Sequence, residues 1–110
     1  MKMKHFDEDY ILLEDMVHDE YYPEFLVEKV KRLIMPVIRL LESGETNLEM
    51  IQDKLDEMTL AINALQKEFD ENDSEIETVA RDSIGKTIGY ILNWFGIDID
   101  METAIRERDW

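Results

Sequence analysis

Cysteine is absent from this sequence, and proline and glycine are scarce. The 110 residues include two prolines and four glycines. Without cysteine the chain has no disulfide, no thiolate nucleophile and no zinc or iron–sulfur site built on cysteine. No repeat, linker or low-complexity tract interrupts the sequence. We therefore expect a single domain over residues 1–110.

Basic residues and long apolar runs are also few. The chain has 12 Lys and Arg against 27 Asp and Glu, a formal net charge of -15. Such a surface repels a phosphate backbone or an anionic membrane, so we expect neither nucleic acid nor membrane as a partner. No stretch approaches the roughly 18 apolar residues of a membrane span, and no signal-peptide core follows Met1. We expect a cytoplasmic protein whose acidity serves solubility or a basic protein partner.

The clearest pattern is an apolar spacing of alternating three and four residues between positions 48 and 69. Only a helix gathers such positions into one stripe, and the stripe must be covered by other helices. We interpret this segment as the spine of a small helical bundle. Its members are Leu48, Ile51, Leu55, Met58, Ile62, Leu65 and Phe69.

The most apolar helix is expected just before the spine. It begins at Pro23, a favourable first helical residue, and ends at Gly44, a typical C-terminal cap. The short turn that follows predicts antiparallel neighbours, with Thr46 or Asn47 as the cap of the spine. Pro36 lies inside this segment and removes a helical hydrogen bond, so we expect a kink or a break there.

Three further helices complete the expected fold. Asp7 caps a first helix over residues 7–19. Ser74 and Glu77 fit a capping box, which predicts a fourth helix that ends at Gly96. A short last helix is expected over residues 101–106. The sequence thus predicts an all-α protein, an antiparallel four-helix bundle with a kinked second helix and a short C-terminal fifth helix.

No catalytic, metal-binding or nucleotide-binding pattern rises above background. Di-metal bundles need carboxylates and histidines that point inward from facing helices, whereas the inward positions of the spine are apolar and His18 has no convergent partner. Gly85-Lys86-Thr87 looks like the end of a phosphate-binding loop, but the upstream glycine and the preceding strand are missing. We expect no metal, no cofactor and no catalytic residue, which favours a non-enzymatic role.

Two glycines, Gly85 and Gly89, lie in the middle of the expected fourth helix. Each costs about 1 kcal/mol relative to alanine at such a position. We therefore expect another backbone to approach this helix closely, either within the domain or across a dimer. The sequence leaves open whether the protein is a monomer or a homodimer.

A candidate interaction or ligand site combines charged and aromatic side chains. Glu77 and Arg81 lie one helical turn apart at the edge of an apolar face, where they can pair. A partly buried arginine needs acceptors. It forms either a structural bracket, which reaches Asp109 or the terminal carboxylate, or an anion-binding site in a cleft. The aromatic members serve as rim packing or as a partner surface. The six residues are Glu77, Arg81, Tyr90, Trp94, Arg108 and Trp110.

Several segments resemble a known family. Tyr21-Tyr22-Pro23 followed by Phe25-Leu26-Val27, the string from Ser74 to Asp82, and Arg106-Glu107-Arg108-Asp109-Trp110 are similar to segments of a small bacterial family catalogued as domain of unknown function 5713. The resemblance runs through the chain in order. It implies a compact helical cytoplasmic protein and assigns no activity and no catalytic residue.

Two hypotheses for the function remain. The first is a non-enzymatic acidic interaction protein that masks a basic protein partner, in the manner of immunity or antitoxin proteins. The alternative is a small-molecule-binding protein or enzyme with a pocket around Glu77, Arg81 and Trp110.

Overall fold

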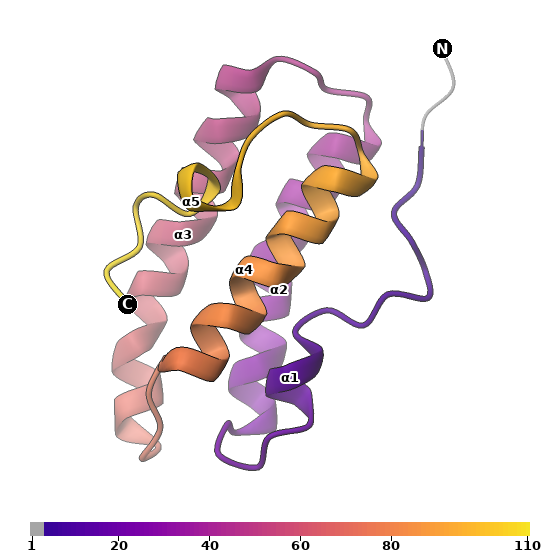
Figure 1. Ribbon diagram of the computed structural model, residues 1–110. Coiled ribbons are helices and arrows are strands. Elements are labelled where there is room, and N and C mark those ends of the chain that lie inside the picture. The colour runs from indigo at the N-terminus through magenta and orange to yellow at the C-terminus, as the bar shows by residue number, and fades with distance from the viewer. Residues whose placement is uncertain (1–3) are drawn as a thin grey trace.

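The computed structural model describes residues 4–110, and these residues form helices and connecting segments without a strand. Three helices are long and two are single turns, and the antiparallel pair α2 and α3 carries α4 in front of it, with α1 and α5 at its flanks (Figure 1). The predicted all-α bundle with a short C-terminal helix is confirmed. The helices are α1 (Glu14–Val17), α2 (Glu24–Glu42), α3 (Leu48–Glu71), α4 (Thr78–Trp94) and α5 (Met101–Ala104).

The turn between α2 and α3 is built as its residues predict. Gly44 follows the end of α2 with a φ of 92°, a left-handed conformation that glycine adopts without strain. Asn47 caps α3, because its side chain accepts a hydrogen bond from the N–H of Met50 at 3.1 Å. Lys29 near the start of α2 reaches Glu68 near the end of α3 at 2.6 Å, so the two helices are antiparallel neighbours.

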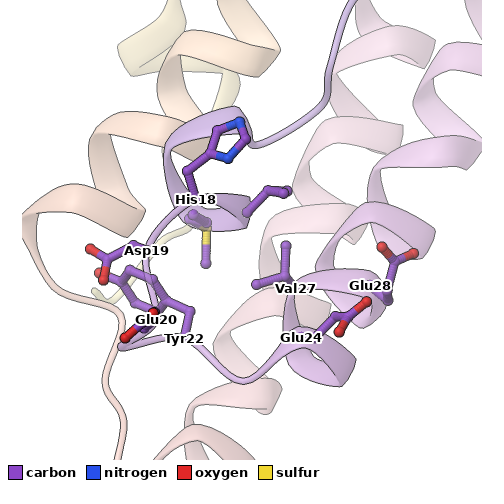
Figure 2. A pocket seen from close by; sticks show the side chains of 9 residues that line it. His18, Asp19, Glu20, Tyr22, Glu24, Val27 and Glu28 are labelled. Carbon is purple, nitrogen blue, oxygen red and sulfur yellow. The ribbon is translucent and has the colours of Figure 1, made fainter.

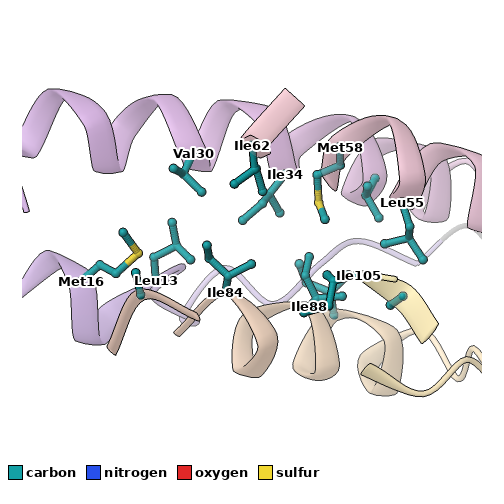
Figure 3. Close-up of a cluster of buried hydrophobic side chains, with 14 of the residues drawn as sticks. Leu13, Met16, Val30, Ile34, Leu55, Met58, Ile62, Ile84, Ile88 and Ile105 are labelled. Atoms are coloured by element: carbon teal, nitrogen blue, oxygen red, sulfur yellow. The ribbon is translucent and has the colours of Figure 1, made fainter. Parts of the chain in front are cut away.

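The core is formed by apolar faces of the long helices that point toward one another (Figure 3). The stripe of α3 is buried as predicted from Ile51 to Ile62 and again at Phe69, whereas Leu48 at its start is 48% exposed. Helix α4 covers the stripe with Ile84, Ile88 and other buried side chains. Full burial of a side chain of this size stabilises the fold by about 1.5–3 kcal/mol.

The predicted first helix over residues 7–19 is wrong, because only α1 is helical there. Leu13 stands in front of α1 with a φ of 56° and a fully buried side chain. Its N–H donates a hydrogen bond to Oγ1 of Thr87 on α4 at 3.1 Å. A leucine in the left-handed conformation is strained, and the burial of its side chain and this hydrogen bond stabilise it there. This conformation prevents the helix from extending back toward Asp7.

The predicted capping box at Ser74 is also wrong. Helix α4 begins later, at Thr78, and the side chain of Glu77 makes no cap hydrogen bond. Ser74 instead caps the C-terminus of α3, because its N–H donates a hydrogen bond to the carbonyl of Phe69 at 2.8 Å. This closure requires a left-handed residue at Asp73, whose φ is 56°.

Pro36 does not divide α2. The helix is continuous from Glu24 to Glu42 with the proline inside it. Of the two outcomes predicted for this position, a break is therefore wrong, and a kink is the one compatible with a continuous helix.

Replacing Asp73 by glycine should stabilise the protein. Glycine removes the strain of a left-handed non-glycine residue, about 1 kcal/mol, and also removes a negative charge beside the C-terminus of α3. We expect a higher free energy of unfolding in urea denaturation. Asp73→Asn is the control for charge and should gain less, and an equal gain in both variants would contradict the backbone argument.

The two glycines of α4 should respond differently to alanine. A Cβ at Gly89 would meet nothing within 4 Å, whereas a Cβ at Gly85 would lie 2.9 Å from the sulfur of Met101. Gly89→Ala should therefore stabilise the protein by about 0.5–1 kcal/mol, and Gly85→Ala should gain less because Met101 must move. Thermal unfolding of both variants measures the difference, and equal gains would show that Met101 imposes no constraint.

Candidate functional site

Two acidic segments that are far apart in the sequence meet at one end of the bundle. Residues 14–28 and 70–77 contain eleven Asp and Glu and no Lys or Arg. The hydroxyl of Ser74 donates to the carbonyl of Tyr21 at 3.1 Å, and the N–H of Ala80 donates to the hydroxyl of Tyr22 at 3.1 Å. The first bond joins the two segments, and the second holds Tyr22 against the start of α4, at the end of the bundle where α2 starts and α3 ends (Figure 1). We call residues 14–28 and 70–77 the acidic end.

The negative charge of both segments affects the pKa values of the two tyrosines at this junction. Burial raises the pKa of the Tyr21 hydroxyl, and the negative charges of Glu77 and Glu75 raise it further. Burial likewise raises the pKa of Tyr22, with smaller contributions from the charges of Asp19 and Glu77. Carboxylates from both segments therefore act on the same place.

A cleft of about 400 Å³ opens within the acidic end, between α1 with its following turn and the start of α2 (Figure 2). Its apolar lining includes the buried side chains of Met16, Tyr22 and Val27. Carboxylates surround this apolar floor. An apolar floor with an acidic rim suits the aliphatic stem and charged head of a lysine or arginine. The cleft is also lined by His18 and by the carboxylate residues Asp19, Glu20, Glu24 and Glu28.

The carboxylates do not form a metal centre. Within residues 4–110, no group of three or more His, Asp or Glu side chains is arranged to hold a metal ion.

Two of the predicted site residues, Tyr90 and Trp94, lie under the N-terminal segment. The hydroxyl of Tyr90 donates to Asp7 at 2.6 Å, and its ring stacks on Tyr10 with centroids 3.9 Å apart. The hydrogen bond to Asp7, burial and the charge of Asp7 raise the pKa of Tyr90. The indole N–H of Trp94 donates to the carbonyl of His5 at 2.9 Å. These contacts make both rings part of the packing within the domain.

Arg81 and Arg108 line a second, smaller groove between α4 and α5, of about 310 Å³. Arg81 forms no ion pair with Glu77, which lies at the N-terminus of α4 and does not line this groove. Trp110 does not line it either. The ring N–H of Trp110 is buried and has no acceptor among the described residues. The predicted bracket between Arg81 and Asp109 is absent, because the side chain of Asp109 accepts a hydrogen bond from Gln66 on α3.

The C-terminal segment is instead held by polar side chains of α3. Asp56 accepts two hydrogen bonds from Arg106, at 2.7 and 3.1 Å. Gln52 donates to the carbonyl of Thr103, and Asn63 donates to the carbonyl of Glu107. The sequence alone does not predict these contacts, because polar positions opposite an apolar stripe usually face water. Their helical spacing was the available signal.

The Asp56–Arg106 pair predicts a dependence of stability on pH. Burial alone would raise the pKa of Asp56, but the hydrogen bonds from Arg106 and Gln52 and the charge of Arg106 outweigh it and lower the pKa. A lowered folded-state pKa stabilises the protein above the unfolded-state value of about 3.9, and this stabilisation is lost as the pH falls through the folded-state pKa.

Asp56→Asn should therefore lower the free energy of unfolding at neutral pH, and its difference from wild type should shrink as the pH falls below about 4. Urea unfolding across this range measures the effect. Asp53→Asn, which removes an exposed carboxylate without a hydrogen bond, is the control and should change stability less. A difference that stays constant with pH would contradict the assigned ion pair.

None of the helices within the described chain is long and apolar enough to cross a membrane. The cytoplasmic location stays a prediction, and the choice between monomer and homodimer stays open.

Neither the curated proteins nor the solved structures contain a match to this chain. Residues 6–110 match the family described as "Family of unknown function (DUF5713)". The match confirms the resemblance seen in the sequence and covers nearly the whole chain. The protein therefore belongs to this family of unknown function.

Proposed function

We propose that the protein is a non-enzymatic interaction protein that binds and masks a basic protein partner through its acidic end. The observation that supports this proposal is the meeting of two segments that contain no Lys or Arg and eleven acidic residues, four of which line a cleft with an apolar floor. A surface of this kind attracts an oppositely charged protein and speeds its association.

The acidic residues of this end are largely left without cationic partners. Among the described residues, Glu28 is the one member of the acidic end that forms an ion pair, with Lys31 at 3.3 Å. Elsewhere the carboxylates of Asp56, Glu68 and Glu102 each pair with a cation. Mutual repulsion at the acidic end is thus largely unrelieved within residues 4–110, and a basic partner would relieve it on binding.

The cleft gives the proposed contact an anchor point. A lysine or arginine of the partner would lay its aliphatic stem on Met16 and Val27 and hold its charged head among the carboxylates of the rim. Burial of the stem adds apolar contact to an attraction that is otherwise electrostatic, which favours one basic segment over a merely positive surface.

The test compares two variants that remove the same amount of charge from different places. The acidic-end variant carries Glu20→Gln, Glu24→Gln, Glu71→Gln and Glu75→Gln. The side variant carries Glu49→Gln, Asp53→Asn, Asp98→Asn and Glu107→Gln. All eight side chains are exposed, and none forms an ion pair or a side-chain hydrogen bond within the described residues.

Capture from native lysate on the immobilised protein should retain a basic protein at low salt and release it at high salt, because salt screens such contacts. The acidic-end variant should lose this protein, and the side variant should keep it. Equal loss in both variants would mean that net charge alone attracts the partner. Retention that is insensitive to salt would contradict the proposal.

A further inference from the structure

The groove between α4 and α5 has a charged rim and an apolar floor. Gly85 of α4 and Ile105 after α5 are buried, and Met101 lies beside them, 2.9 Å from where a Cβ of Gly85 would be. The absence of a side chain at Gly85 lets the side chain of Met101 pack against α4 and form part of this floor. Arg81 and Lys86 stand on the α4 wall, and Arg108 stands on the opposite wall.

Positive charge gathers here in a chain that is otherwise acidic. Arg108 is bound to Glu102 at 2.9 Å. Arg81 and Lys86 are exposed and form no hydrogen bond or ion pair with the part of the chain that the structure describes. Asp82 is the remaining acidic lining residue. Because the lining holds three cations and two carboxylates, the groove has a positive balance although the chain carries a net charge of -15.

We propose that this groove binds a small organic anion. A carboxylate or phosphate of the ligand contacts Arg81 and Lys86, and its apolar part lies on Ile105 and Met101. The planar guanidinium of arginine matches the oxygens of both groups. A volume of about 310 Å³ fits a small molecule rather than a polypeptide segment. This site is separate from the acidic end, so the proposal does not depend on the basic partner.

Titration of the full chain with three probes, followed by the NMR signals of the Ile105 and Met101 methyl groups, tests the site. The probes are phenyl phosphate, benzoate and inorganic phosphate. Phenyl phosphate, benzoate or both should shift these signals saturably, and the one that binds more tightly identifies phosphate or carboxylate as the preferred group. Inorganic phosphate, which has no apolar part, should bind more weakly than the better organic probe.

Arg81→Gln should weaken binding about threefold to tenfold, in line with an ion pair near the surface. Lys67→Gln is the matched control, because Lys67 is an exposed and unpaired cation of α3 within the described residues. It should leave the affinity unchanged. The proposal is overturned if no organic probe shifts the two methyl signals, if inorganic phosphate binds as tightly as the organic probes, or if the two variants weaken binding equally.

Discussion

The packing of α2 against α3 is the interaction on which the rest of the structure depends. Each of these helices is long enough to present a continuous apolar face, and the short turn at Gly44 and Asn47 brings the two faces side by side. Helix α4 then covers the exposed side of this pair (Figure 3). Single-turn helices such as α1 and α5 are not stable alone, so they form where Leu13 and Ile105 are buried by the larger elements.

This arrangement also explains where the charge lies. The antiparallel hairpin places the start of α2 and the end of α3 at the same end of the bundle, and with them the two acidic segments. The Lys and Arg side chains lie outside these two segments, where Lys29, Lys54 and Arg106 pair with carboxylates. Charge of one sign gathered at one end opposes folding by self-repulsion. Where a fold departs from the best local choice, a functional site is the usual reason.

The parts of the fold that were predictable rest on local rules. The spacing of the α3 stripe, the cap at Asn47 and the helix ends at Gly44 and Gly96 all follow from contacts within a few residues. The N-terminal segment was not predictable in this way. A helix from Asp7 satisfies local preferences, but the hydrogen bond of Leu13 to Thr87 and the aromatic contacts of Tyr90 are made across the chain and override them.

In the candidate sites too, the residue types were predictable from the sequence, whereas the contacts between distant segments were not. The sequence shows that both segments of the acidic end are acidic, but their meeting depends on the tertiary bond between Ser74 and Tyr21. Arg81 stood out because it is charged beside an apolar face, and the structure places it with Arg108 in one groove. The expected contact between Arg81 and Asp109 is absent, and Gln66 of α3 donates a hydrogen bond to the Asp109 carboxylate instead. A helical wheel of α4 shows only residues of α4, so it could not reveal that Gln66 of α3 binds Asp109.

The most direct test of this account is the salt dependence of stability in the two charge variants. If negative charge is concentrated without relief at the acidic end, the acidic-end variant should gain more free energy of unfolding over wild type at low salt than the side variant does. The gain should fade near 1 M salt, where charges are screened beyond about 3 Å. Equal gains in the two variants would contradict the account, because they would show that repulsion is spread evenly over the surface.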